Sequence, residues 1–150
     1  MRGKAMQAPG APGAFQVRYE LTGRPLVSVL IPNKVHVEDL DRCLRSLYKN
    51  AGYDNFEVLV IENNSTDPAT FAYYDRIIAD PDMPRCKVVR YHGGFNFSAI
   101  NNFGARYASG EYLLLLNNDI EILSPDFVRE LLSYAQRADV GAVGAKLYYP

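Results

Sequence analysis

The stretch YLLLLNNDIEI, residues 112–122, decides the fold. Four consecutive leucines are typical of a strand buried on both faces, as strands of a parallel sheet are. The run ends in Asn117, Asn118 and Asp119, three polar side chains that a core does not absorb easily. We therefore expect a buried strand over residues 111–117 whose carboxyl end carries a polar site.

Apolar runs of strand length also occur before and after this stretch, and segments of helical periodicity separate them. The other predicted strands cover residues 26–31, where Pro32 ends the strand, and residues 56–62, 86–91 and 140–149. Helices are predicted over about 37–51, after the Asp67 cap, from a Ser98 cap to about Gly110, and from Ser124-Pro125 to about Arg137. This alternation predicts an α/β fold, a mostly parallel sheet with helices on both faces.

Polar residues follow the other predicted strands as well. They are Pro32-Asn33-Lys34, Glu62 through Asp67, and His92 through Asn96. One such loop is ordinary turn chemistry, but ligands of open parallel sheets bind outside the carboxyl ends of the strands. Four converging polar loops therefore predict a binding site.

Single residues of these loops allow two interpretations each. Asp119 is either a solvated loop or capping carboxylate, or an oxygen ligand of a hard divalent cation. Glu62 is either a surface acid or, at the end of an apolar strand, an acceptor for an N–H on the edge of a base. We interpret His36, His92, Cys43 and Cys86 as structural.

Composition excludes several classes of protein. Sixteen Lys and Arg against seventeen Asp and Glu, without a long block of either sign, predict no nucleic-acid binding. Two cysteines without metal-type spacing favour reduced core thiols and a cytoplasmic location, either free or at the inner face of the membrane. No apolar run reaches the roughly 18 residues of a membrane span. The sequence contains no GxGxxG after the first strand, no GxxxxGK[ST] and no GxSxG.

Residues 1–24 are predicted to be a flexible tail or linker. Residues 1–14 are rich in Ala, Gly and Pro without periodicity, which predicts disorder, while residues 15–21 alternate weakly and suggest a short edge strand or an extended lead-in. Organised sequence then runs over residues 25–150.

The residues from about Leu26 to Pro150 resemble the family 2 inverting glycosyltransferases, which have the Rossmann-like, nucleotide-sugar-binding GT-A fold. The resemblance is carried by VSVLIPNK, VLVIENNSTDP, FNFSAINNFGARYASGEYLLLLNND and VGAVGAKLYYP. It is strongest to transferases that build bacterial surface polysaccharides, including rhamnosyl and O-antigen transferases. The resemblance implies a UDP- or dTDP-sugar donor and a saccharide or lipid-linked saccharide acceptor.

The resemblance also implies roles for particular residues. Pro32, Asn33, Lys34, Glu62, Asn64 and Asn118 match nucleotide-binding positions, with Glu62 at the uracil edge, and Asp119 matches the ligand of Mn or Mg. The sequence departs from the family at Asn117, where Asp is usual, and at Lys34, where Tyr is frequent. In the family the general base comes from a later segment, so we expect residues 25–150 to end before the acceptor-binding segment and the base to lie beyond Pro150.

Two other functions compete with this interpretation. A sugar nucleotidyltransferase should carry a Gly-rich, Arg-containing loop after the first strand, and PNKVHVED is not such a loop. A non-catalytic nucleotide-sugar-binding or interaction module with a degenerate metal motif is supported by Asn117. We therefore expect sugar transfer with inversion in polysaccharide biosynthesis, with the non-catalytic module as the alternative.

Overall fold

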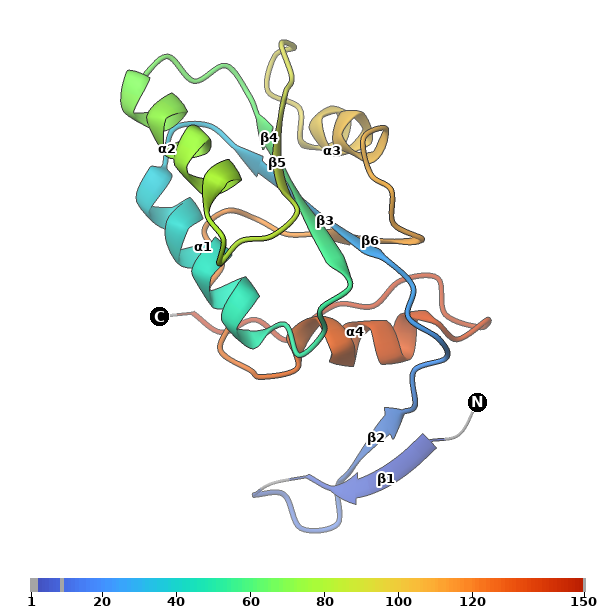
Figure 1. Cartoon of the computed structure of the whole chain (residues 1–150). Coiled ribbons are helices and arrows are strands. Elements are labelled where there is room, and N and C mark those ends of the chain that lie inside the picture. The colour runs from blue at the N-terminus through green and yellow to red at the C-terminus, as the bar shows by residue number, and fades with distance from the viewer. Residues whose placement is uncertain (1–2, 9, 150) are drawn as a thin grey trace.

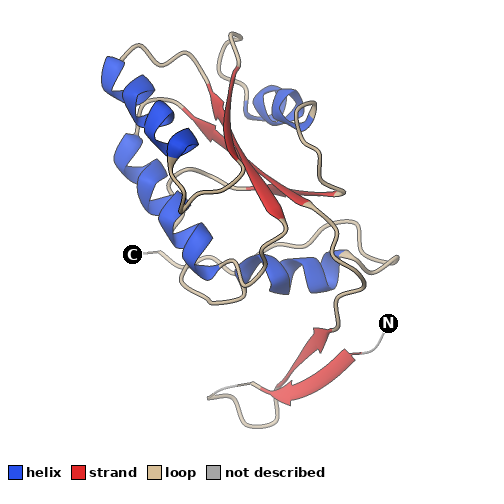
Figure 2. Cartoon of the chain, in the orientation of Figure 1, coloured by secondary structure: helices blue, strands red, loops and turns tan. Residues whose placement is uncertain are grey.

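A four-stranded parallel sheet forms the centre of the molecule in the computed structural model, which describes residues 3–8 and 10–149. The strand order is β5-β4-β3-β6, and helices cover both faces (Figure 1, Figure 2). The strands are β3 (Val27–Asn33), β4 (Phe56–Glu62), β5 (Cys86–Arg90) and β6 (Tyr112–Leu115). The predicted α/β class with a parallel sheet is confirmed.

The helices are divided between the two faces of the sheet by the alternation of apolar residues along the strands. The helices are α1 (Val37–Asn50), α2 (Pro68–Ala79), α3 (Phe97–Ala105) and α4 (Phe127–Ala135). Val29 and Val58 belong to a core cluster with buried residues of α1, α2 and α4. Leu30 and Leu59 belong to a second cluster with Ile100 of α3. Each strand of the sheet centre is therefore covered on both sides, as its unbroken apolar sequence predicts.

Close packing of α3 on the sheet depends on a glycine. A Cβ atom at Gly104 would lie 2.3 Å from Cδ1 of Ile61, far inside van der Waals contact. The missing side chain lets the helix approach β4 closely and so brings the N-terminus of α3 near the carboxyl ends of the strands. Asn96 caps this helix, with its side chain accepting from the Ala99 N–H at 2.9 Å. The predicted Ser98 cap and the helix end near Gly110 are wrong, since the helix starts at Phe97 and ends at Ala105.

The prediction that Pro32 ends its strand is also wrong, because β3 continues through Asn33. Leu30 accepts a hydrogen bond from Leu116 on the β6 side, so Pro32, two residues on, turns its nitrogen to the same side. The pairing with β6 has ended there, since its register stops at Leu30 with Leu115. The missing N–H of Pro32 therefore costs no ladder bond.

Strand β6 is an edge strand of the sheet rather than a strand buried on both faces. Leu113 and Leu115 are half exposed, while Leu116, just after the strand, is buried. The strand is also shorter than expected, because its ladder with β3 spans only Tyr112 to Leu115. Four leucines in a row predicted the strand correctly but not its place at the edge.

Strand structure near the N-terminus replaces the disorder predicted for residues 1–14, whereas the short strand suggested over residues 15–21 is present. Strands β1 (Gly3–Gln7) and β2 (Phe15–Tyr19) form an antiparallel hairpin that extends from the body in Figure 1. Contacts with α4 hold β2: Arg18 pairs with Glu130 at 3.0 Å, and the rings of Tyr19 and Tyr134 meet edge to face at 5.4 Å. These partners lie more than 100 residues away in the sequence, so composition could not predict them.

The C-terminal part of the chain also differs from expectation. Helix α4 begins at Phe127 rather than at Ser124-Pro125, because Asp126 before it has a left-handed backbone with φ 62°. The segment 140–149 is predicted as a strand but has no strand structure, and most of its residues are exposed. A strand needs a neighbour for its backbone hydrogen bonds, and no strand in the described residues pairs with it.

Candidate functional site

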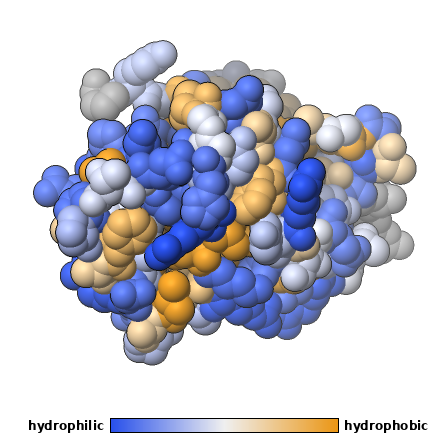
Figure 3. Space-filling model, turned by 90° about the horizontal axis from the view of Figure 1, so that it is seen from above, coloured by the Kyte–Doolittle hydropathy of each residue, from blue (hydrophilic) through white to orange (hydrophobic). Residues whose placement is uncertain are grey.

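The carboxyl ends of the four parallel strands meet at one edge of the sheet, and those of β3, β4 and β5 point toward the top of Figure 1. Figure 3 looks onto this end and shows apolar residues lying among hydrophilic ones. A cavity of about 420 Å³ lies there, and residues from the end of β3, the start of α3 with the loop before it, and the loop after β6 line it: Pro32, Phe95, Phe97, Asn117, Asn118 and Asp119. The topology thus brings together residues that are up to 87 positions apart in the sequence.

Asn33 joins the wall of this cavity to the interior. Its side chain is buried, and its Oδ1 accepts a hydrogen bond from Nδ2 of Asn118 at 2.7 Å. Its own Nδ2 donates to the hydroxyl of Tyr74 at 2.8 Å and to the carbonyl of Val35 at 2.9 Å. The bond to Asn33 uses one of the two amide N–H groups of Asn118, and the side-chain oxygen of Asn118 accepts no hydrogen bond from a described residue, so this oxygen is available to a ligand.

Glu62, at the end of β4, is the centre of a hydrogen-bond network with Ser65, Tyr74 and Asn33, called the Glu62 network below. Its side chain is only 3% exposed. Its carboxylate accepts hydrogen bonds from the Ser65 N–H, from the Ser65 hydroxyl at 2.7 Å and from the Tyr74 hydroxyl at 2.5 Å. Burial and the Glu62 carboxylate raise the pKa of Tyr74, so its hydroxyl stays protonated and keeps donating. In this structure Glu62 therefore holds the loop that follows its own strand.

The loop after β3 is strained and is clamped from two sides. Val35 has φ 62°, a left-handed conformation that a β-branched residue rarely adopts. Its N–H donates to the hydroxyl oxygen of Ser65 at 2.9 Å, and its carbonyl accepts from Asn33. Lys34, just before it, is exposed. The Glu62 network thus sets the position of the exposed loop that carries Lys34.

Two asparagines connect the loop after β4 with the loop after β5. Nδ2 of Asn64 donates to the carbonyl of Gly93 at 2.8 Å, and Nδ2 of Asn63 donates to the same carbonyl at 2.9 Å. Asn64 has φ 58° and is exposed, whereas Asn63 is buried. Asn64 is therefore placed at the rim of this end of the sheet, between two loops, rather than on the wall of the cavity.

Asp119 lies on the cavity wall with its side chain exposed. Beneath its loop, the thiol of Cys43 in α1 donates to the carbonyl of Asn117 at 3.5 Å. Burial, and secondarily the negative charge of Asp119, raises the pKa of Cys43 to about 12, so this thiol stays protonated at neutral pH. Cys43 is therefore a structural support for the loop, in agreement with its predicted role.

The donor set around Asp119 fits a divalent cation that takes most of its ligands from a bound molecule. Among residues 3–8 and 10–149 no group of three His, Cys, Asp or Glu side chains could hold a metal. Asp119 contributes one carboxylate, and the neighbouring amide oxygens of Asn117 and Asn118 are hard ligands of the kind that Mg²⁺ and Mn²⁺ accept. Mg²⁺ in particular is usually bound by one or two carboxylates plus phosphates and water.

The structure sorts the predicted site residues into two groups. Pro32, Asn118 and Asp119 share the cavity wall. Asn33, Lys34, Glu62 and Asn64 do not line it, although Asn33 bonds to Asn118 and Glu62 supports the adjoining loops.

Sequence reasoning missed three residues of this end of the sheet. Phe95 and Phe97 line the cavity, but the sequence marked them only by their position, Phe95 within the polar loop 92–96 and Phe97 directly after it. Tyr74 belongs to the network, and it looked like any aromatic residue at core spacing on a helix.

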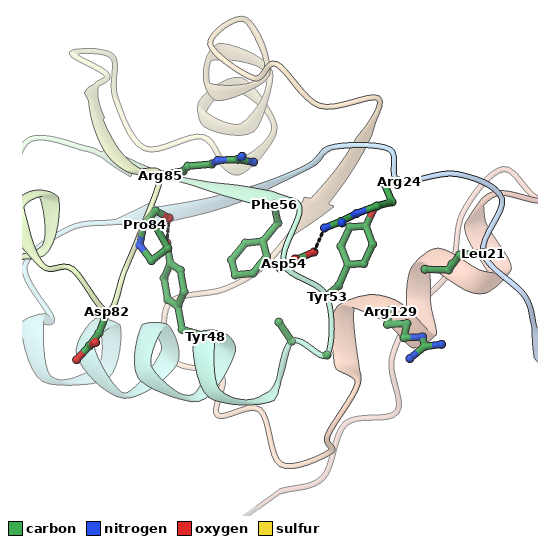
Figure 4. A pocket seen from close by; sticks show the side chains of 12 residues that line it. Leu21, Arg24, Tyr48, Tyr53, Asp54, Phe56, Asp82, Pro84, Arg85 and Arg129 are labelled. Carbon is green, nitrogen blue, oxygen red and sulfur yellow. Dashed lines mark hydrogen bonds and ion pairs between the residues drawn. The ribbon is translucent and has the colours of Figure 1, made fainter.

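A larger cavity, of about 780 Å³, lies at the opposite end of the sheet, by the amino ends of β3 and β4. Figure 4 shows the side chains of Arg24 and Arg85 pointing toward one another above the ring of Phe56. Arg24 is paired with Asp54 at 2.5 Å, and Arg85 donates to Asn55 at 2.9 Å. None of the predicted site residues lies there, and ligands of parallel sheets bind at the other end. Size alone therefore does not identify the functional cavity.

The sequence model named Glycosyl transferase family 2 matches residues 28–150. The chain belongs to this family. Among curated relatives, the O-antigen biosynthesis protein RfbC of Myxococcus xanthus is 44% identical over 140 residues, which is 93% of this chain and 11% of that protein. An uncharacterized glycosyltransferase of Haemophilus influenzae is 28% identical over 124 residues, 82% of this chain and 37% of that protein. The chain thus spans between about a tenth and two fifths of these relatives.

Solved structures of glycosyltransferases share the fold. The mannosyltransferase PcManGT from Pyrobaculum calidifontis, in complex with GDP-Man and Mn2+, superposes with a TM-score of 0.70 at 23% identity, covering 80% of this chain and 35% of that one. S. aureus TarS 1–349 in complex with UDP-GlcNAc superposes with a TM-score of 0.59 at 22% identity, covering 73% and 30%. In the described part of this chain, no helix is both long enough and apolar enough to span a bilayer.

Proposed function

We propose that residues 25–150 form the nucleotide-sugar-binding part of a glycosyltransferase of polysaccharide biosynthesis. The donor is a UDP- or dTDP-sugar, the acceptor is a saccharide or lipid-linked saccharide, and transfer proceeds with inversion. Membership of glycosyltransferase family 2 and the similarity to an O-antigen biosynthesis protein support this assignment. The observation that carries it is the cavity at the carboxyl ends of the strands, where Asp119 and Asn118 face the same space as Pro32.

In this proposal the chain's own residues bind and orient the donor. Asp119 and the oxygen of Asn118 would hold Mn or Mg, and the ion would supply positive charge against the departing diphosphate. Pro32, Asn33, Lys34 and Asn64 border the nucleotide. The Glu62 network positions the loop after β3 and the loop after β4, which carry Lys34 and Asn64, through Ser65, Val35 and Asn33.

Glu62 contributes to nucleotide binding mainly as a positioning residue. Both of its oxygens already accept hydrogen bonds from Ser65 or Tyr74. A direct contact of Glu62 with the base, which the family resemblance implies, stays a prediction. Either role makes affinity depend on Glu62, but only the direct contact makes it depend on which base the ligand carries.

A second candidate is a non-catalytic nucleotide-sugar-binding module. The observation that favours it is Asn117, which leaves Asp119 as the single carboxylate on the cavity wall. The two candidates differ in their use of metal: a transferase that relies on the ion to stabilise the leaving diphosphate should bind the nucleotide more tightly with metal, whereas a binding module can hold the nucleotide without it.

Calorimetric titration of the chain with UDP and dTDP, with GDP as a comparison, tests the proposal. We expect a nucleoside diphosphate to bind in the presence of Mn²⁺ or Mg²⁺ and to lose affinity when EDTA removes the metal. Binding of equal strength with and without metal would favour the non-catalytic module. Failure of all three nucleotides to bind in the presence of metal would contradict both candidates.

A further inference from the structure

Two phenylalanines at the cavity are exposed to an unusual degree. Phe95 is 80% exposed and Phe97 is 45% exposed, and both line the cavity with Asp119. Large exposed apolar side chains that gather at a cavity mark a binding surface more often than single scattered ones do.

Local structure does not account for these two side chains. Phe95 precedes the Asn96 cap of α3, the position from which a hydrophobic staple would pack on Ile100. Ile100 is buried in the core cluster of that face, but Phe95 is not among the described side chains packed against it. Neither Phe95 nor Phe97 forms an aromatic pair within residues 3–8 and 10–149, whereas the ring centroid of Phe103 lies 5.3 Å from that of Tyr91.

The cavity wall has two chemical characters. Phe95, Phe97 and Pro32 supply apolar surface, and Asn117, Asn118 and Asp119 supply amide and carboxylate groups. A pyranose ring has the matching pair of characters, because its hydroxyls project from the edge and its C–H bonds present apolar faces. Those C–H bonds carry partial positive charge and are attracted to the negative face of an aromatic ring.

We propose that Phe95 and Phe97 form an aromatic wall that stacks against the sugar ring of the nucleotide-sugar donor and contributes to the choice of sugar. This inference rests on the proposed function. The sugar is bonded directly to the diphosphate, which the metal at Asp119 would hold in this cavity. The residues expected near the base, Glu62 and Asn64, do not line the cavity, so the aromatic wall faces the sugar rather than the base.

The size of the cavity agrees with a ligand fragment. Its volume of about 420 Å³ falls at the lower end of the roughly 300–1,000 Å³ typical of small-molecule sites. The cavity is therefore suited to the sugar and diphosphate, with the nucleoside lying over the neighbouring loops after β3 and β4.

The test compares a nucleotide with its own sugar conjugate. Wild-type protein, the double variant Phe95→Ala/Phe97→Ala and the control Phe15→Ala are titrated with Mn²⁺ present, first with UDP and dTDP and then with UDP- and dTDP-hexoses. Phe15 is a matched control because it is 67% exposed and lies in the hairpin strand β2. Phe95→Trp/Phe97→Tyr retains the aromatic faces and serves as the rescue variant. Unchanged thermal midpoints show that all variants fold.

We expect the alanine pair to bind the free nucleotide as the wild type does, within about twofold, and to bind the nucleotide sugar roughly tenfold more weakly, about 1.4 kcal/mol. The aromatic rescue variant and Phe15→Ala should bind both ligands like the wild type. If the alanine pair loses equal affinity for nucleotide and nucleotide sugar, the wall contacts the nucleotide instead and the inference is overturned. The inference is also overturned if the alanine pair loses affinity for neither ligand. If the wild type binds no nucleotide, the proposed function fails and the inference falls with it.

Discussion

The two ends of the parallel sheet are built on the same plan and differ in where their polar networks lead. Each end has a buried glutamate of β4: Glu57 at the amino end and Glu62 at the carboxyl end. Glu57 accepts from the Ser28 hydroxyl at 2.7 Å, the Ser109 N–H at 2.7 Å and Lys87 at 2.9 Å. Its charge is neutralised inside its own network, so Glu57 presents no free charge to a ligand.

At the carboxyl end the network opens outward instead. From Glu62 it passes through Ser65 to Val35, beside the exposed Lys34, and through Tyr74 and Asn33 to Asn118 on the cavity wall. The amino end nevertheless has the larger cavity, about 780 Å³ against 420 Å³. Under the proposed function, the site therefore lies at the end where buried groups position exposed ones, although the other end has the larger cavity.

The largest expected difference between the two ends concerns Asp119. Asp119→Ala should lower Mn-dependent nucleotide affinity by at least about 100-fold, more than the 10–100-fold typical of residues that only support a metal ligand. Arg129→Ala, in the amino-end cavity, should leave affinity unchanged. Calorimetry with the nucleotide that the wild type binds measures both.

The control for this comparison is Glu121→Ala, which removes a nearby exposed acid that does not line the cavity. Its affinity should match the wild type. Retained Mn dependence in Asp119→Ala would remove Asp119 from the site.

The next comparison exchanges each buried glutamate for glutamine. Both Glu62→Gln and Glu57→Gln should lower the free energy of unfolding by roughly 1–3 kcal/mol, because an amide group then meets donors that had bonded to a carboxylate. Only Glu62→Gln should also weaken nucleotide binding, by roughly 1–3 kcal/mol, since its network holds the loops of the site. Urea unfolding and calorimetry separate the two effects.

An equal loss of affinity in both variants would mean that binding simply follows stability and that the two ends are not distinct. A loss that differs between UDP and GDP in Glu62→Gln would instead support direct contact with the base.

A smaller effect is expected for Asn117→Asp, which restores the acid usual in the family. A second, partly hydrated charge near the ion should tighten Mn²⁺ binding by about 1 kcal/mol, or around fivefold. Titration with Mn²⁺ in the presence of nucleotide measures this change. Unchanged metal affinity would show that the side chain of residue 117 does not face the ion.

The smallest effect is a pH dependence of stability that belongs to the amino end. Burial alone would raise the pKa of Glu57, but the hydrogen bonds from Lys87, Ser109 and Ser28 outweigh it and lower the pKa below 4.5. A carboxyl whose pKa is lower in the folded than in the unfolded state stabilises the fold above its unfolded pKa, and this stability is lost as the pH falls. The free energy of unfolding should therefore decline below about pH 4.5, and it should decline less steeply in Glu57→Gln. Urea unfolding at pH 3 to 6 would contradict this if the two slopes were equal.

Local sequence determined the elements of the central sheet and the loops that follow its strands. Apolar runs of strand length and the Asp67 cap, whose side chain accepts from the Ala69 N–H at 3.0 Å, are signals carried by neighbouring residues. Parallel strands bring their carboxyl ends to one edge, so the gathering of Pro32, Asn118 and Asp119 could be predicted as well. The direct contact of Asp119 with a metal stays a prediction.

Only the tertiary structure decided which polar residues turn inward and which turn outward. The sequence shows Asn33 and Glu62 as polar residues at strand ends, but their burial depends on Tyr74 of α2, which bonds to both. Strand β1, which lies within residues predicted to be disordered, and the exposed segment 140–149, which was predicted as a strand, were predicted wrongly, whereas the short strand suggested over residues 15–21 was found. Strand β2 is held by α4, more than 100 residues away, and the segment 140–149 has no strand partner among the described residues. Local composition and periodicity carry no record of whether such a distant partner is present.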